Sequence, residues 1–178
     1  ETVLDNVATT GLQPDDIGHL VLTHCHIDHV GGAHRYGELV GGRIIAHALD
    51  CDAIEGRKPE LTAADWYGVD YVPVEVDMKL EGDETLVLDG VQFLFLHTPG
   101  HTPGSMSVMI EKEGQKVLFA QDVHGPFQDE WGSSIPQWRE SMEKLIALEP
   151  DILCEGHFGV YRGKERAREY VEGYLERY

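Results

Sequence analysis

The sequence predicts a mixed α/β (α+β) domain in which two β-sheets pack together and helices cover them on the outside. Short apolar runs typical of strands are grouped in the middle of the chain, and segments with helical spacing precede and follow them. Strands that come in runs joined by hairpin turns favour packed sheets over a doubly wound parallel sheet. Without internal repeats or a long linker, residues 1–178 are predicted to form one domain.

The first part of the chain is predicted to alternate helices with short strands. The apolar run at residues 20–22 ends at Thr23 and is typical of a buried strand. Gly31 and Gly32 are expected to turn the chain tightly into the next helix, because glycine tolerates turn conformations at little cost. The expected strands are residues 20–22 and 43–46, and the expected helices are residues 2–10, 33–39 and 48–55.

Two hairpins are predicted further along the chain, at Asp89-Gly90 and at Glu113-Gly114. A helix is expected to start at Ser134, because serine caps helix N-termini and Pro136 is tolerated in the first turn. The strands expected here are residues 85–88, 91–96, 105–110, 116–120 and 151–154, and a charged surface helix is expected over residues 162–178.

Charge narrows the possible partners. The chain has 32 Asp and Glu residues against 14 Lys and Arg residues, which gives a formal net charge of −18. A surface this acidic repels nucleic-acid phosphates and anionic lipids, so we expect a small-molecule substrate and neither nucleic acid nor membrane as a partner. The three cysteines make no disulfide framework and fit a reducing, cytoplasmic location.

Four candidate metal ligands lie within six residues directly after the first predicted strand: His24, His26, Asp28 and His29. In extended backbone, residues two apart point the same way, so His24 and His26 can converge on one ion while Cys25 points elsewhere. If the chain then turns, Asp28 and His29 can reach a second ion nearby.

Three further candidates each follow the C-terminal end of an apolar strand. His101 lies in the loop Thr98-Pro-Gly-His-Thr-Pro-Gly, Asp122 follows the strand at residues 116–120, and His157 follows the strand at residues 151–154. Strand ends on a rigid scaffold are common positions for functional side chains. We therefore expect all seven residues to meet in one small volume.

In this order and spacing, the seven residues resemble the metal-ligand pattern of the metallo-β-lactamase superfamily. The phrase at residues 98–105 resembles the form found in its glyoxalase II-like and persulfide dioxygenase-like branches. The resemblance covers residues 1 to about 160 and implies a four-layer αββα sandwich with the metals at one edge. It also implies that His24, His26 and His101 hold one ion, that Asp28, His29 and His157 hold a second, and that Asp122 bridges them.

The chemistry that the resemblance implies is metal-dependent hydrolysis. Two divalent ions, Zn²⁺ by preference and Fe or Mn as acceptable substitutes, suit a ligand set of nitrogen and oxygen atoms. A hydroxide that bridges the ions would attack a small ester, thioester, lactone or similar substrate. Asp122 and Asp28 are the expected catalytic ligands, and His124 is the best nearby candidate for the general acid.

Two alternatives stay open. In a persulfide dioxygenase-like enzyme, a single iron would be held by the counterparts of His24, His101 and Asp122 alone. The other alternative is a metal-binding domain without catalytic activity. Metal content separates the first alternative from the hydrolase, and turnover on a broad substrate panel separates the second.

Several neighbouring residues have simpler interpretations. Cys25 is expected to pack away from the site, and His97 is expected to be a hydrogen-bonded structural histidine. Trp66, Tyr67 and Tyr71 could line a substrate pocket, but burial in the core is the favoured interpretation because aromatic side chains contribute much of most cores.

The start of the chain departs from the family pattern. Family members begin with several strands and an Asp-x-Gly element, whereas this chain starts at the helix expected after them. One sheet is therefore expected to be incomplete at its N-terminal edge, and an open edge is a template for another strand. A homodimer that covers this edge is the hypothesis that follows.

Overall fold

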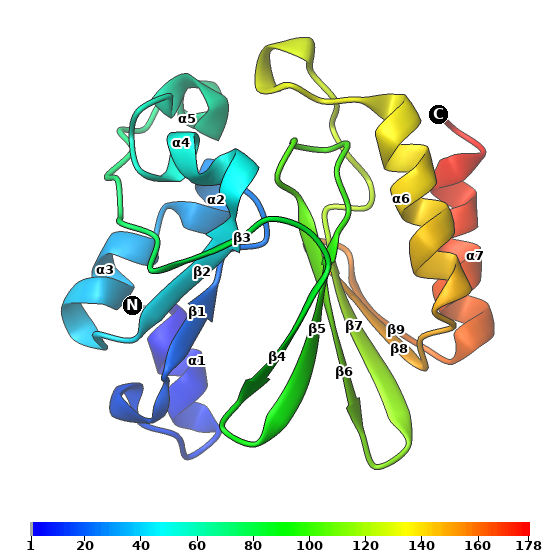
Figure 1. Ribbon diagram of the computed structural model, residues 1–178, viewed down its shortest axis with the longest axis horizontal. Helices are drawn as coiled ribbons and strands as arrows, with labels where there is room; N and C mark the ends of the chain where they lie inside the picture. Colours follow the sequence, from blue (N-terminus) through cyan, green and yellow to red (C-terminus); the bar gives the residue numbers. More distant parts are fainter. Residues whose placement is uncertain (1) are drawn as a thin grey trace.

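Two β-sheets follow one another along the chain in the computed structural model, which describes residues 2–178 (Figure 1). The first sheet has three strands, and both of its strand pairs are parallel. The second sheet has six strands in sequence order, antiparallel except for the pair β7–β8. The strands are β1 (His19–Val21), β2 (Arg43–His47), β3 (Met78–Leu80), β4 (Glu84–Leu88), β5 (Val91–His97), β6 (Met106–Lys112), β7 (Gln115–Gln121), β8 (Ile152–Glu155) and β9 (Gly159–Arg162).

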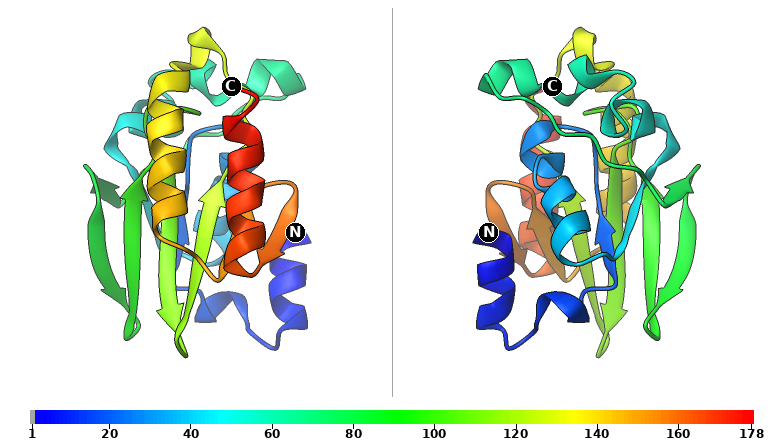
Figure 2. Two further views of the ribbon diagram at one scale, coloured as in Figure 1. Left: turned by 90° about the vertical axis from the view of Figure 1, so that its right-hand side faces the viewer. Right: turned by 90° about the vertical axis from the view of Figure 1, so that its left-hand side faces the viewer.

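Helices lie outside both sheets, so the layers run helix, sheet, sheet, helix, as Figure 1 and Figure 2 show. This confirms the predicted four-layer αββα arrangement. The helices of the first half are α1 (Thr2–Thr9), α2 (Ile27–Val30), α3 (Ala33–Leu39), α4 (Cys51–Ile54) and α5 (Ala64–Tyr67), and those of the second half are α6 (Ile135–Ala147) and α7 (Lys164–Leu175). Short 3₁₀ turns are η1 (Pro14–Asp16), η2 (Ala48–Asp50), η3 (Pro59–Thr62) and η4 (Asp129–Trp131).

The apolar core is divided by the two sheets into three clusters, because successive side chains of a strand point to opposite faces. On β2, Ile44 and Ala46 pack under the helices of the first half, whereas Ile45 packs between the sheets. On β5, Phe95 packs between the sheets and Leu96 packs under α6 and α7. The clusters hold the two sheets face to face and bring together the ends of β1, β5, β7 and β8.

The first sheet differs from the antiparallel pattern that dominates the predictions. Its strands are parallel because helical segments lie between successive strands and return the chain to the same edge. The predicted helix over residues 48–55 is divided into η2 and the short helix α4. Gly31 and Gly32 form the predicted turn between α2 and α3, with φ −60° and −89°, so neither glycine uses the left-handed backbone that favours glycine.

Strand β9 was not predicted, because its four residues are mostly exposed and show no alternation of apolar and polar side chains. The N-terminal cap of α6 was predicted correctly, since the Ser134 hydroxyl accepts a hydrogen bond from the backbone N–H of Gln137. Strand β1 lies at the edge of the first sheet and has β2 as its one strand neighbour within residues 2–178. Across that same range, the helices are all too short or too polar to cross a bilayer.

Candidate metal centre

The loop after β1 carries the first four predicted ligands in the expected arrangement. The loop bends at His24, and the backbone of His26 is extended, with φ −69° and ψ 147°. The chain then turns into α2, which holds Asp28 and His29. Cys25 is buried and its thiol lies 3.5 Å from the carbonyl oxygen of Leu61, so it packs away from the ligands as predicted.

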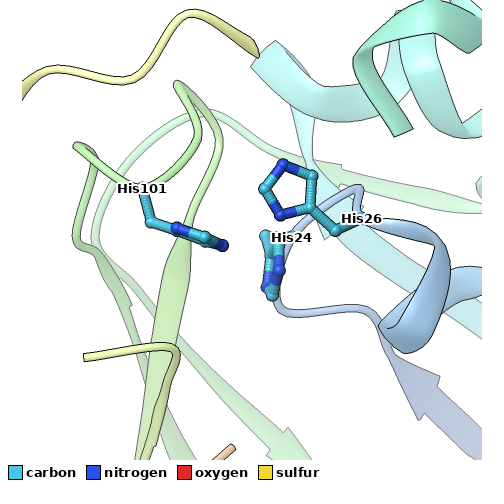
Figure 3. A group of neighbouring side chains, drawn as sticks. All are labelled: His24, His26 and His101. Atoms are coloured by element: carbon cyan, nitrogen blue, oxygen red, sulfur yellow. The ribbon is translucent and has the colours of Figure 1, made fainter. Parts of the chain in front are cut away.

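His24, His26 and His101 form a compact group that we call the triad. Their ring centroids lie 4.5 to 4.9 Å apart, and all three side chains are buried. Figure 3 shows the rings pointing toward one another, His24 and His26 from the loop after β1 and His101 from the loop after β5. One ring nitrogen of each histidine lies within 4.8 Å of those of the other two, so one cation can be reached by all three.

The triad has unused lone pairs. The Nε2 atoms of His24, His26 and His101 are buried and have no hydrogen-bond partner among the described residues. Buried polar atoms without partners are rare in folded proteins and call for an explanation such as an ion. On His101 the opposite nitrogen, Nδ1, lies 2.9 Å from the carbonyl oxygen of Pro126 and donates to it, which leaves the lone pair on Nε2. The residues present therefore fit a bound metal ion.

Burial also keeps the triad in the state that binds metal. It lowers the pKa of His26 to about 3 and that of His101 to about 4. The pKa of His24 is lowered well below its ordinary value, first by burial and then by the neighbouring histidines. A neutral imidazole is the form that coordinates a cation, so these side chains need lose no proton at neutral pH.

Asp28, His29, Asp122 and His157 form a second group, which we call the quartet. The Nε2 atom of His157 lies 3.2 Å from Asp28 Oδ2 and 3.3 Å from Asp122 Oδ2. The Nε2 atom of His29 lies 3.2 Å from Asp122 Oδ1 and 3.2 Å from His157 Nε2. Four ligand atoms within 4.8 Å of one another match the set predicted for a second ion.

Charge in the quartet differs from charge in the triad. Burial lowers the pKa of His29, but the hydrogen bond to Asp122 and the negative charges of the neighbouring carboxylates together outweigh burial, so the pKa is raised overall. Burial raises the pKa of Asp122, but the hydrogen bond from His29 and the attraction of the surrounding histidines together outweigh burial, so the pKa is lowered. A carboxylate that remains charged at low pH is a suitable ligand for a divalent ion.

Asp122 joins the two groups. Its Oδ1 atom faces His29 of the quartet, and its Oδ2 atom lies 3.6 Å from Nε2 of His101 in the triad. It follows β7 and is held by a hydrogen bond from its backbone N–H to the Gln121 side chain. This position between the groups suits the bridging ligand that the sequence predicts.

A cleft of about 280 Å³ opens onto both groups. Its aromatic rim consists of Trp66, Tyr67, Trp131 and Phe158. Trp66 and Tyr67 are 62% and 58% exposed, so the prediction that they belong to the core is wrong. They lie on α5, which is only four residues long and has one buried residue, so their rings project beyond the core. Tyr71 does pack against the core of the first half, as predicted.

The aromatic rim touches the ligands directly. The ring of Trp131 lies 4.6 Å from that of His26 and 4.5 Å from that of Trp66. The hydroxyl of Tyr67 lies 3.4 Å from Asp28 Oδ2. Trp131 was missed in the sequence, because a single tryptophan on a 3₁₀ turn carries no spacing that connects it with the histidines.

His124 lines the same cleft, and its catalytic role stays a prediction. Its Nδ1 atom lies 2.8 Å from Oε1 of Glu155, and Oε2 of Glu155 accepts hydrogen bonds from the backbone N–H groups of His157 and Phe158. Glu155 was also missed, although its position directly after a predicted strand and two residues before His157 was a usable signal. His97 is a hydrogen-bonded structural histidine as predicted, since its Nε2 atom lies 2.9 Å from the carbonyl oxygen of Pro103.

Sequence relatives include lactonases. The chain is 29% identical over 167 residues to an N-acyl homoserine lactonase of Bacillus thuringiensis, a match that covers 88% of this chain and 62% of that protein. It is 30% identical over 113 residues to an N-acyl homoserine lactonase of a Bacillus species, covering 64% of this chain and 40% of that protein. The chain thus spans about two fifths to three fifths of the length of these relatives.

Solved structures with the same fold include metallo-β-lactamases. One from Cronobacter sakazakii with a HARLDQ motif has a TM-score of 0.75 at 24% identity, covering 98% of this chain and 66% of that chain. MIM-1 from Novosphingobium pentaromativorans has a TM-score of 0.76 at 20% identity, covering 98% of this chain and 74% of that chain. The family model described as the metallo-beta-lactamase superfamily matches residues 4–157, which include all seven predicted ligands. This chain therefore belongs to the metallo-β-lactamase superfamily.

Proposed function

We propose that this chain carries the metal centre of a hydrolase that opens lactones or cleaves related small esters and thioesters. The observation that carries the proposal is the convergence of seven ligands at the base of one cleft, with the buried Nε2 atoms of the triad unpaired. The lactonase relatives support the choice of substrate class, because a lactone is a cyclic ester whose carbonyl reacts like that of other esters.

The ligand groups have separate tasks in this proposal. The triad holds the first ion, the quartet holds the second, and Asp122 contributes to both. Two divalent cations bound there, Zn²⁺ by preference, would supply an activated water molecule and a Lewis acid for the carbonyl oxygen of the substrate. Iron and manganese also accept ligands of this kind, so the identity of the metal is a matter for direct analysis.

Residues around the ligands complete the reaction. The aromatic rim excludes water from one side of the cleft and offers an apolar surface to the substrate beside its carbonyl group. His124 is assigned as the general acid, because Glu155 accepts from its Nδ1 atom and the doubly protonated ring then has a proton on Nε2 to give to the departing alkoxide or thiolate. Asp28 and Asp122 orient the reacting groups through the ions that they bind.

Persulfide dioxygenase-like chemistry is less well supported. It would use His24, His101 and Asp122 for a single iron and would leave the other ligands without a task. The Nε2 atom of His26 is buried and unpaired within the described residues, and the Nε2 atoms of His29 and His157 lie 3.2 Å apart. In a two-metal site His26 would be a ligand of the first ion, and the close approach of His29 and His157 would be accounted for by the second ion.

The decisive experiment combines metal analysis with a substrate panel. We expect the purified protein loaded with Zn²⁺ to hold two ions per chain and to hydrolyse at least one lactone, ester or thioester. One tightly bound iron with oxygen-dependent turnover of a persulfide would replace this proposal with the dioxygenase. Two bound ions without turnover on the whole panel would favour the silent domain.

Location and assembly are proposed on separate grounds. The free thiols of Cys25, Cys51 and Cys154 support a reducing compartment such as the cytoplasm. Strand β1 at the edge of the first sheet supports a homodimer that pairs through this edge. Light scattering tests the dimer, and a monomer at high protein concentration would rule it out.

A further inference from the structure

Asp50 is a buried carboxylate that lies outside the metal ligands but touches both loops that carry the triad. Only 3% of its surface is exposed, and it ends η2 after strand β2. No Lys or Arg of the described residues pairs with it, so its charge is balanced by hydrogen-bond donors alone. The removal of a charge from water is costly unless such donors are in place.

The donors come from the two loops. The Oδ2 atom of Asp50 accepts from the backbone N–H of Cys25 at 3.0 Å and from the hydroxyl of Thr102 at 2.7 Å. Its Oδ1 atom accepts from the backbone N–H of Gly104 at 2.7 Å. Cys25 lies between His24 and His26, and Thr102 follows His101, so one carboxylate is bonded next to all three members of the triad.

The contact with Asp50 also explains why Thr102 and Gly104 occur in the loop at residues 98–104. A Cβ atom on Gly104 would lie 2.5 Å from Cγ of Asp50, so only glycine lets the loop approach the carboxylate this closely. A hydroxyl network holds the Thr102 side chain in place, because its Oγ1 atom lies 2.9 Å from Oγ of Ser105. The backbone N–H of Thr102 donates to the same Ser105 oxygen at 3.0 Å.

The two bonded loops belong to different sheets. The Cys25 loop follows β1 of the first sheet, and the Thr102 loop follows β5 of the second. One side of the triad could therefore shift relative to the other whenever the sheets move. A buried carboxylate with donors from both loops resists that shift, because each lost hydrogen bond leaves part of a charge unsatisfied.

We propose that Asp50 is a positioning residue, which sets the separation between the two loops and so preorganises the triad for its metal ion. The inference rests on the metal centre of the proposed function, but it does not depend on which substrate is hydrolysed. Partners that orient metal ligands commonly change metal affinity by about 10–100-fold when they are removed.

The test uses metal affinity in folded variants. In Asp50→Asn, the side-chain NH2 group faces at least one of the three hydrogen-bond donors and cannot accept a hydrogen bond from it. Thr102→Val removes one donor hydroxyl and keeps the shape of the side chain. We expect both to weaken Zn²⁺ binding by about 10–100-fold, measured by competition with a coloured chelator. The visible absorption spectrum of the Co²⁺-loaded protein should change as well, because it reports the geometry of the ligands.

Two matched controls isolate positioning from general stability. Thr102→Ser keeps the hydroxyl and should keep Zn²⁺ affinity near that of the parent. Asp151→Asn makes the same chemical change in a carboxylate that accepts from the backbone N–H of Lys116 at 2.9 Å, away from the site. It should lower the melting temperature without a change in Zn²⁺ affinity or in the Co²⁺ spectrum.

Parent-like affinity and spectrum in folded Asp50→Asn would overturn the inference. If Asp50→Asn does not fold, Thr102→Val decides, and equal affinity in Thr102→Val and Thr102→Ser would overturn it. A parent protein that binds no Zn²⁺ or Co²⁺ would remove both the metal centre and this inference. A parent that binds metal but hydrolyses nothing would contradict the proposed function alone, and the affinity of the variants would still decide the role of Asp50.

Discussion

The triad and the quartet hold the same kinds of ligand in different surroundings. All three histidines of the triad are buried and neutral, and their pKa values are lowered by burial. Two members of the quartet, Asp28 and His157, are exposed in the cleft. Both groups take ligands from both sheets and both meet the aromatic rim, the triad where Trp131 lies beside His26 and the quartet where Tyr67 lies beside Asp28.

The difference in burial indicates different roles for the two groups: the triad is suited to retaining a metal ion, and the quartet is suited to presenting one to the substrate. A buried set of neutral nitrogen donors favours tight retention, because the ligands are desolvated and fixed before the ion arrives. An exposed set that includes carboxylates is accessible to water and substrate at some cost in rigidity. We therefore expect the first ion to stabilise the fold and the second to complete the reaction centre.

The largest effect is expected where the two groups meet. Asp122→Ala removes the carboxylate that faces both groups, so turnover should fall to the uncatalysed background while the protein stays folded. Kinetics on the best substrate of the panel, with circular dichroism as the check on folding, measure this. Activity within about tenfold of the parent would contradict the bridging role.

Metal removal should distinguish the groups by stability. A ligand at ~1,000 times its Kd adds about 4 kcal/mol to the free energy of unfolding, which corresponds to a fall in Tm of roughly 10 °C on chelation. Most of this fall should persist in His157→Ala, which keeps the triad, and disappear in His26→Ala. Thermal melts with and without chelator test it, and equal losses in the two variants would erase the proposed distinction.

The next variant, at His124, tests whether a side chain of the cleft donates a proton during catalysis. His124→Ala should lower kcat on the order of 10²-fold if the side chain is the general acid, and it should leave metal content unchanged. Glu155→Gln keeps the size of the group that holds His124 and should have a smaller effect. A parent-like kcat in His124→Ala would remove this role.

The smallest expected effect concerns the pKa of a buried histidine that is not among the predicted metal ligands. This residue is His47. Its side chain is 1% exposed, and burial lowers its pKa to about 4. The unfolded chain takes up a proton near pH 6.5 and the folded chain does not, so stability is full above about pH 6.5 and is lost as pH falls toward 4.

His47→Gln removes this titration, so the loss of stability between pH 7 and pH 5 should be smaller by about 2 kcal/mol than in the parent. Denaturant melts of the metal-free protein measure it at each pH. The same slope in parent and variant would show that His47 does not contribute to the pH dependence of stability.

Most of the metal centre was predictable because its ligands lie in short, dense patterns. His24 and His26 are two apart in the loop after β1, and His101, Asp122 and His157 each follow a strand. The groups that support them were missed because their partners are far away in sequence. Asp50 bonds to Thr102 over 52 residues, and Trp131 meets His26 over about twice that separation.

The fold was predictable to a similar degree. The hairpin turns at Asp89-Gly90 and Glu113-Gly114 determine the antiparallel strands, and both appear where the sequence places them. Pairing in the parallel first sheet depends on which strand ends meet after a crossover, and local periodicity carries no information about that. The exposure of Trp66 likewise follows from how α5 sits on the rest of the chain.

The sequential order of the two sheets divides the metal centre along the chain. Strand β3 ends at Leu80 and β4 begins at Glu84, so no strand of either sheet is contributed by the other half. Four ligands precede this junction and three follow it, and the triad includes members from both sides. An ion held by the triad would therefore act as a cross-link between two halves that the chain joins through a few residues. If the protein were cut at residues 81–83, reassembly of the fragments should depend on the concentration of metal.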